Sequence, residues 1–424
     1  MMIQRPKGTE DILPKEVYKW HYVEDVIKRI AKNFGYEEIR TPIFEHTELF
    51  ERGVGDTTDV VEKEMYTFID RGNRSVTLKP EGTAPVARAF IEHKLYADTQ
   101  PVKMFYITPV FRYERPQARR YRQHHQFGIE VFGSPNPSAD AEVINLAMTV
   151  YKTLGVRDLE LRINSVGCSK CRAEYHRILK QYLEDRLDRL CTTCRGRFER
   201  NPMRIIDCKS NACQAELMEV PLILDHICDE CRDHFEALKK YLEILKLEYV
   251  VDPRIVRGLD YYTKTAFEII TDEVGKRGTV CGGGRYDRLV EDCGGPGTPG
   301  VGFGMGLERT ILTLENKGIE IPKPAGPDVF IITIGDSASY EGFKLLNQLR
   351  ETDLVADMDH LSRSVKAQFK YADRLTAGYT IVIGEEELSK GTVKLRNMTD
   401  GRELEVASDD IVDVLKQNIV CNRG

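Results

Sequence analysis

Residues 110–133 read VFRYERPQARRYRQHHQFGIEVFG, and this stretch decides how the rest of the chain is interpreted. The residues leading into it from Met104 and those following from His125 are rich in aromatic and β-branched side chains, which predicts two strands. The loop between them is too long for a tight hairpin turn. Five arginines and one glutamate lie between Phe111 and Gln126. Since guanidinium groups pair with phosphate and carboxylate oxygens, we expect an anion site here; the alternative is a solvated hairpin tip.

Composition limits the class of protein. The 424 residues, 41% of them hydrophobic, are enough for a large core and two or three domains. Because the net charge is −6, any nucleic-acid binding must rest on local basic patches. The N-terminal residues MMIQRPKGTEDILPK contain no apolar run, and no stretch approaches the ~20 apolar residues of a membrane span. We therefore expect a cytoplasmic protein without a signal peptide or membrane contact.

A turn at residues 79–83 is the next candidate site. The periodicity predicts a helix over 17–34, a strand over 36–43 broken by Pro42, and a short strand over 76–78. The turn Lys79-Pro80-Glu81-Gly82-Thr83 follows and leads into a helix over 84–93. Glu81 and Thr83 lie where the backbone N–H groups of that helix are free, so capping is one role for both. A position after a strand end also favours side chains that point into a cleft.

Two glycine-rich strings follow in the second half of the chain. One is Cys281-Gly-Gly-Gly-Arg-Tyr-Asp287, and the other runs from Gly300 to Arg309 with alternating glycines. Alternating glycines in a strand indicate that another molecule or backbone comes very close. Neither string matches a dinucleotide-binding or P-loop pattern.

Paired cysteines mark residues 168–247 as an inserted helical module. Eight of the eleven cysteines of the chain lie here: Cys168, Cys171, Cys191, Cys194, Cys208, Cys213, Cys228 and Cys231. CxxC pairs at this density are typical of tetrahedral zinc, and eight thiols suffice for two structural Zn²⁺ sites. The alternative is a set of small buried thiols without metal.

The last hundred residues form a separate unit. A proline-rich linker over 321–327 precedes a β-α-β pattern, which predicts a smaller α/β domain. A helix predicted over 361–376 carries Leu361, Val365, Phe369 and Ala372 on one stripe. Its opposite face carries Arg363, Lys366, Lys370 and Arg374. That basic face is either a phosphate track for RNA or a solvated surface.

Taken together, these strings resemble one family, the histidyl-tRNA synthetases of the class II aminoacyl-tRNA synthetases. The three class II motifs match the first helix with the Pro42 strand, residues 111–132, and residues 302–309. The family's histidine-specific signatures match Arg257-Gly-Leu-Asp-Tyr-Tyr262 and Gly283-Gly-Arg-Tyr-Asp287. The resemblance implies an α+β fold: an antiparallel sheet flanked by helices in a class II catalytic domain over 1–325, the helical Cys-rich insertion over 168–247, and a C-terminal α/β anticodon-binding domain over 327–424. It also implies a homodimer.

The resemblance further implies an activity. The enzyme would activate L-histidine with ATP and Mg²⁺ to histidyl-adenylate and pyrophosphate, then transfer histidine to the 3′ end of tRNA(His). Negative charge accumulates on the phosphoryl oxygens in such a reaction, so fixed cations are needed. The matching catalytic and ATP-binding residues are Arg112, Arg257 and Arg309. The residues matching the histidine site are Glu81, Thr83, Gln126, Glu130, Tyr261 and Tyr262.

The hairpin loop matches the segment that approaches the acceptor end of the tRNA, with Arg115, Gln117, Arg119 and Arg120 as expected contacts. Two other functions are compatible with parts of the pattern. One is a catalytically silent, synthetase-like regulatory subunit of ATP phosphoribosyltransferase, which should lack the C-terminal domain. The other is a zinc-dependent RNA-binding protein with an inactive core.

Overall fold

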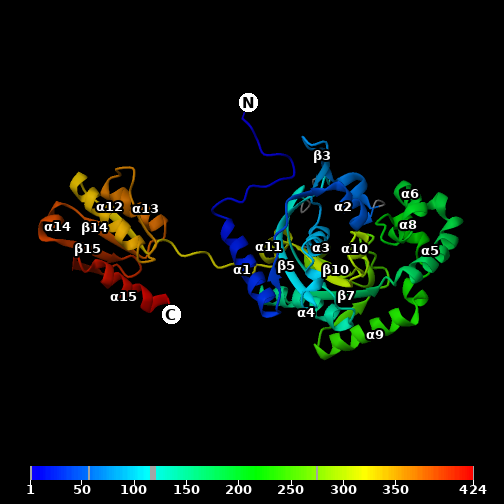
Figure 1. Ribbon diagram of the computed structural model, residues 1–424. Helices are drawn as coiled ribbons and strands as arrows, with labels where there is room; N and C mark the ends of the chain where they lie inside the picture. Colours follow the sequence, from blue (N-terminus) through cyan, green and yellow to red (C-terminus); the bar gives the residue numbers. More distant parts are fainter. Residues whose placement is uncertain (1, 56–57, 115–120, 274–275, 424) are drawn as a thin grey trace. The chain divides into compact units, whose positions relative to one another are not determined.

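The computed structural model describes residues 2–55, 58–114, 121–273 and 276–423 (Figure 1). The chain divides into two compact units, Met1–Pro322 and Lys323–Gly424. Among the described residues, no helix is both long and apolar enough to cross a membrane.

In the first unit, eight described strands form one sheet in the order β1-β5-β6-β11-β10-β9-β7-β8. The outer pairs β1–β5 and β7–β8 are parallel, and the five pairs between them are antiparallel. This sheet confirms the predicted fold class. The strands are β1 (Glu37–Glu38), β5 (Val102–Phe111), β6 (Gln123–Phe132), β7 (Leu159–Ser165), β8 (Tyr249–Val251), β9 (Thr263–Glu273), β10 (Lys276–Arg285) and β11 (Gly300–Gly306).

Strand alternation gives the sheet one apolar face and one face that carries the site. On β6, Phe127, Ile129 and Val131 belong to the main hydrophobic core, together with Val301, Phe303 and Met305 of β11. Since successive side chains point to opposite faces, Gln126 and Glu130 project the other way, beside the glycines of β11. The core also receives side chains from four helices: α1 (Val17–Asn33), α4 (Pro137–Thr153), α9 (Asp229–Ile244) and α11 (Leu307–Asn316).

A smaller sheet lies before the Glu81 turn in the sequence. It has the order β2-β4-β3, from β2 (Phe44–His46), β3 (Tyr66–Ile69) and β4 (Ser75–Leu78). The strand predicted over 36–43 is present only as β1, because the segment around Pro42 separates β1 from β2. Strand β4 leads to α3 (Thr83–Glu92), the helix predicted after the Glu81 turn. Helix α2 (Thr47–Phe50) and short α10 (Leu289–Asp292) complete this part.

Helices make up the segment between β7 and β8 in the described chain. They are α5 (Ser169–Glu184), α6 (Thr192–Arg200), α7 (Met203–Ile206), α8 (Asn211–Glu216) and α9. Helices α5, α6 and α8 gather at one end of the first unit, drawn in green in Figure 1, whereas α9 packs with α4 in the main core. Tyr175, Leu179 and Leu183 of α5 are buried with the cysteines in a hydrophobic cluster that continues into the site side of the large sheet through Tyr106 and Tyr262.

The second unit has a five-stranded described sheet in the order β13-β12-β14-β15-β16. Strand β12 is parallel to β13 and β14, and β15 and β16 form an antiparallel hairpin. The elements are β12 (Val329–Thr333), α12 (Asp336–Arg350), β13 (Ala356–Met358), α13 (Val365–Arg374), β14 (Tyr379–Ile383), α14 (Glu385–Lys390), β15 (Thr392–Asn397), β16 (Glu403–Ala407) and α15 (Ile411–Arg423).

The helix predicted over 361–376 begins later than expected, at Val365. Ser362 has a φ of +53°, and Asp359 accepts hydrogen bonds from the backbone of Leu361 (3.2 Å) and Arg363 (2.7 Å), so these residues form a turn. Leu361 is therefore 69% exposed and not part of the apolar stripe. The Arg363 side chain pairs with Asp359. The basic face of α13 itself reduces to Lys366, Lys370 and Arg374, all exposed.

Candidate active site

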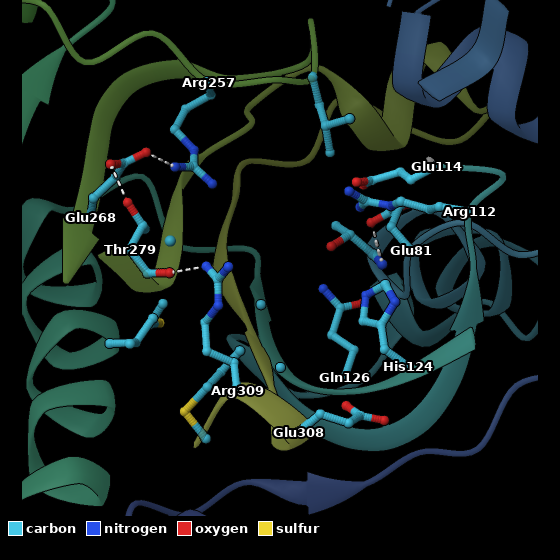
Figure 2. A pocket seen from close by; sticks show the side chains of 18 of the residues that line it. Glu81, Arg112, Glu114, His124, Gln126, Arg257, Glu268, Thr279, Glu308 and Arg309 are labelled. Atoms are coloured by element: carbon cyan, nitrogen blue, oxygen red, sulfur yellow. Dashed lines mark hydrogen bonds and ion pairs between the residues drawn. The ribbon is translucent and has the colours of Figure 1, made fainter. Parts of the chain in front are cut away.

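A cavity of about 400 Å³ collects side chains from the β5–β6 hairpin, the loop over 252–262, β10, β11 and α11. Arg112, Arg257 and Arg309 all line it (Figure 2). They come from three distant parts of the sequence, so the sheet brings the predicted arginines together around one space.

Backbone contacts orient Arg112. It follows β5, and its Nε donates to the Pro80 carbonyl at 2.8 Å. Its own backbone N–H donates to the carbonyl of Arg122 at 2.8 Å, which closes the described base of the hairpin. The guanidinium is thereby attached to the turn that carries Glu81.

Arg257 and Arg309 are connected through Thr279. The Nη1 of Arg257 pairs with Glu268 at 2.6 Å, and the other oxygen of Glu268 accepts from the Thr279 hydroxyl at 3.0 Å. Arg309 donates to the Thr279 carbonyl. The ion-pair partner of Arg257 is thus Glu268. The buried Nε of Arg257 has no hydrogen-bond partner among the described residues.

Glu81 both caps α3 and lines the cavity. Its carboxylate accepts from the backbone N–H groups of Thr83 (2.8 Å) and Ala84 (2.7 Å). Burial raises the pKa of Glu81, although these N–H groups oppose the shift. Gln126 is tied to the same turn, because its Oε1 accepts from the Gly82 backbone at 2.9 Å. Capping and presentation into the cleft are therefore compatible here.

Glu130 lies beneath the cavity and does not line it. It is fully buried, Tyr106 donates to its Oε1 at 3.1 Å, and Tyr286 donates to its Oε2. The Thr83 hydroxyl also hydrogen-bonds with it. Burial raises the pKa of Glu130 to about 8, although these hydroxyl groups favour the ionised form. Its surroundings are hydroxyl groups, so a polar pocket and not hydrocarbon encloses this acid.

Tyr261 and Tyr262 close the polar end of the cavity. Both are 7% exposed, and their ring centroids lie 4.6 Å apart. Tyr261 also meets the ring of Tyr286 edge-on at 5.5 Å. The two predicted tyrosines and Thr83 thus line the same space as Glu81 and Gln126.

The alternating glycines of β11 make room for side chains of the neighbouring strand. A Cβ on Gly304 would lie 2.1 Å from Nε2 of Gln126, and one on Gly302 would lie 2.4 Å from Oε2 of Glu130. The close approach predicted from the sequence is real. A Cβ on Gly302 would also lie 2.1 Å from the carbonyl oxygen of Ile129, which is a backbone atom. The nearest atom to a Cβ on Gly304 is a side-chain nitrogen.

Four residues of the site were not singled out from the sequence: Tyr106, His124, Glu268 and Tyr286. Tyr286 belongs to the Gly283–Asp287 string, which offered a signal, and Tyr106 pairs directly with Gly128, a large side chain opposite a glycine. His124 lines the cavity, and burial together with the nearby Arg112 cation lowers its pKa to about 3. Its ring is therefore neutral at pH 7. Glu268 sits in an ordinary strand pattern and gave no signal.

The expected tRNA contacts Arg115, Gln117, Arg119 and Arg120 lie outside the described residues. The cysteines of the insertion, in contrast, form two described clusters. Cys168, Cys171, Cys228 and Cys231 make the first; Cys191, Cys194, Cys208 and Cys213 make the second. Within each cluster the sulfur atoms lie within 4.8 Å of one another, so each could hold a metal ion.

Each cluster contains at least one cysteine that directly precedes a helix. Cys168, Cys191 and Cys228 directly precede α5, α6 and α9, where backbone N–H groups stabilise a thiolate. Burial opposes ionisation of Cys168, but the N–H groups of the first turn outweigh it and lower its pKa to about 7. The backbone N–H of Cys194 lowers the pKa of Cys191 to about 7 as well.

The sheet and the three arginines around one cavity define the catalytic core of a class II aminoacyl-tRNA synthetase. Residues 8–310 match the family of histidyl-tRNA synthetases, and residues 328–418 match a family of anticodon-binding domains. Because the first match covers more than half of the chain, the chain belongs to the histidyl-tRNA synthetase family.

Relatives agree over nearly the full length. A histidine–tRNA ligase of Alkaliphilus oremlandii is 72% identical over 97% of this chain and 98% of its own length. One of Caldanaerobacter subterraneus is 60% identical over 98% of this chain and all of its own length. The crystal structure of apo histidyl-tRNA synthetase from S. aureus superposes with a TM-score of 0.84 at 42% identity, and covers 98% of this chain and 100% of that one.

Proposed function

We propose that this protein is a histidine–tRNA ligase, which activates L-histidine with ATP to histidyl-adenylate and pyrophosphate and then esterifies the 3′ end of tRNA(His). The convergence of Arg112, Arg257 and Arg309 on one cavity, above a buried acid, carries the proposal. Full-length relatives at 72% and 60% identity bear the same name. The silent regulatory subunit is disfavoured, because its expected loss of the C-terminal domain is not seen.

In the first step, a carboxylate oxygen of histidine attacks the α-phosphorus of ATP, and pyrophosphate leaves. The three guanidinium groups screen the repulsion between the anions and stabilise the charge on the phosphoryl oxygens. Mg²⁺ bound with ATP would supply further positive charge. Glu114 and Glu308 line the same cavity and carry the carboxylate oxygens that Mg²⁺ prefers, whereas Glu268 is held by Arg257 and Thr279.

Histidine is selected by polar groups at the tyrosine end. We assign the α-ammonium to Glu81 and Thr83, and the imidazole to Glu130 and Tyr262. Gln126 lines the same pocket. A substrate without ring nitrogens would leave buried polar groups unpaired, which is how such a site rejects it. Tyr261 packs against the rings of Tyr262 and Tyr286.

The experiment that tests the function is ATP–pyrophosphate exchange with and without histidine, followed by charging of tRNA(His). We expect that exchange depends on histidine. We also expect that the enzyme charges tRNA(His) at an enzyme concentration similar to that used for exchange. A regulatory subunit or an inactive RNA-binding protein would show no exchange, and that outcome would exclude the proposed activity.

The tRNA is proposed to meet both units. Residues 1–325 would be the catalytic domain with the insertion over 168–247, and 327–424 the anticodon-binding domain, where the exposed Lys366, Lys370 and Arg374 offer phosphate contacts. At the acceptor end the contacts would be Arg115, Gln117, Arg119 and Arg120.

Replacement of these four loop residues by alanine is expected to lower the rate of tRNA charging about tenfold or more while exchange stays within about twofold, because phosphate contacts position the RNA and not the adenylate. Paired exchange and charging assays on one preparation measure this. Equal losses in the two assays would mean that the loop serves the first step.

A C2 homodimer in the cytoplasm is the proposed assembly. Ile43, Phe44, Phe68 and Ile69, on or next to β2 and β3 of the small sheet, are 46–61% exposed. Ile43 and Phe44 follow Pro42 in the first class II motif. Phe44 and Phe68 lie on the same face of the small sheet, and exposed apolar side chains of this kind are suited to self-association.

Both cysteine clusters are proposed to hold structural Zn²⁺. Sulfur–sulfur distances of 3.5 Å (Cys168–Cys171) and 3.9 Å (Cys191–Cys208) compare with about 3.8 Å for a tetrahedral site with Zn–S bonds of ~2.3 Å. Backbone N–H groups of Cys228 and Cys191 donate to sulfur atoms of Cys171 (3.1 Å) and Cys213 (3.2 Å), as thiolate ligands require.

Elemental analysis of the purified protein is expected to give about two equivalents of zinc per chain, one for each four-thiolate cluster. Titration of the released metal with a chromogenic chelator, after thiols are blocked, provides an independent count. Less than about half an equivalent would rule out both sites.

A further inference from the structure

The loop over 252–262 carries the histidine signature but has no regular structure. It connects β8 to β9, and Arg257, Tyr261 and Tyr262 project from it into the cavity. Without helix or ladder hydrogen bonds, its backbone groups need other partners to hold these side chains in place.

The first partner comes from the helix that begins at cluster one. Arg172 follows Cys171 on α5, and its Nη1 donates to the carbonyl of Asp260 at 3.0 Å and to that of Tyr262 at 3.1 Å. These two carbonyls flank Tyr261. One half-buried guanidinium therefore fixes the backbone on both sides of that tyrosine.

The second partner comes from the helix that begins at cluster two. Asn201 follows the last residue of α6, and its Nδ2 donates to Oδ1 of Asp260 at 2.5 Å. On the same helix, Arg197 pairs with Asp59 at 2.6 Å. Asp260 is thus held at its carbonyl by α5 and at its carboxylate by α6.

We propose that the two four-cysteine clusters, with zinc bound, position the histidine-recognition loop through Arg172 and Asn201. The inference rests on the proposed function of that loop in binding histidine. It adds Arg172 and Asn201 as positioning residues that touch no substrate, and it gives the insertion a role in the first step of the reaction.

The clusters are suited to this role by where they lie. Cluster one joins the start of α5 to the start of α9, and α9 is anchored in the main core by Phe235, Leu238 and Leu242. Arg172 lies within the first turn of α5, so fixing the helix start to α9 fixes its guanidinium relative to the sheet. Cluster two joins the start of α6 to the segment around Cys208 and Cys213.

Arg172→Met tests the inference directly, with Arg177→Met as the matched control. Arg177 lies on the same helix, is 65% exposed and pairs with Glu174. Arg172→Met leaves all eight cysteines intact. We expect it to keep about two equivalents of zinc while the Kd for histidine, measured by calorimetry, rises about tenfold or more, since two charged hydrogen bonds are lost. The Kd for ATP should change less than about threefold, and Arg172→Lys should recover part of the histidine affinity.

Removal of the clusters supplies the second measurement. Two double variants each remove one cluster: Cys171→Ser with Cys231→Ser, and Cys194→Ser with Cys213→Ser. Each is expected to lose about one equivalent of zinc and to bind histidine more weakly. Unchanged histidine affinity in Arg172→Met with zinc present would overturn the inference, as would zinc loss with unchanged affinity. The proposed function fails separately, if the unmodified protein neither binds histidine nor catalyses histidine-dependent exchange.

Discussion

Replacement of Arg112 by glutamine is expected to lower histidine-dependent ATP–pyrophosphate exchange by about 100- to 1,000-fold, the range found when one preorganised donor to a developing anion is removed. Arg112 is held by the Pro80 carbonyl at 2.8 Å, so its guanidinium needs no reorganisation when charge develops on the α-phosphate. Glutamine keeps a donor of similar reach but lacks the positive charge. The loss should therefore appear mainly in kcat.

Arg157→Gln is the control for this variant. Arg157 is exposed between α4 and β7 and does not line the cavity, and its replacement by glutamine changes the net charge by the same amount. Its exchange rate should match that of the unmodified protein. If Arg112→Gln raised only the KM for ATP and left kcat unchanged, Arg112 would contribute to binding of the ground state and not to the transition state.

The second large effect is expected for Glu130→Gln. Glutamine cannot ionise, so it cannot form the charge-assisted pair that results when the imidazole takes up the proton of Glu130. We therefore expect about a 10- to 100-fold rise in the KM for histidine. The KM for ATP should stay within about twofold, because Glu130 lies beneath the cavity at the tyrosine end. Steady-state exchange with each substrate varied separately measures both constants. Equal rises in the two KM values would contradict the assignment of Glu130 to the imidazole.

The same variant should change how stability depends on pH. The pKa of Glu130 is about 8 in the folded protein and near 4.5 when unfolded, so between these values the folded state holds a proton that the unfolded state has released. Folding then takes up a proton, and the free energy of unfolding falls as pH rises from about 5 to 8. Glutamine removes this contribution. The variant should gain stability relative to the unmodified protein across that window, by an amount on the order of a few kcal/mol.

Urea unfolding at pH 5, 6, 7 and 8 compares the two proteins, with tryptophan and tyrosine fluorescence as the signal. A constant difference between them at every pH would mean that Glu130 is ionised in the folded protein. In that case the hydroxyl groups of Tyr106 and Tyr286 would stabilise the carboxylate more than burial destabilises it.

The sequence alone determined what depends on neighbours along the chain. Alternation in residues 123–132 places Phe127 and Ile129 on one face and Gln126 and Glu130 on the other, and the structure confirms that division. The antiparallel sheet and the meeting of three arginines around one site were expected from the family resemblance. The local error at 361–376 arose because a stripe of apolar residues does not reveal the turn that Asp359 imposes.

Only the tertiary structure decided which distant groups meet. Eight cysteines allow many pairings, and the fold joins Cys168 and Cys171 to the pair at 228 and 231, about sixty residues later. The same holds for Glu268 as the partner of Arg257. The raised pKa of Glu130 depends on its burial among side chains from three separate segments, which contribute Thr83, Tyr106 and Tyr286. Residue spacing encodes local geometry, whereas burial and electrostatic environment are properties of the packed molecule, and these give the site its chemistry.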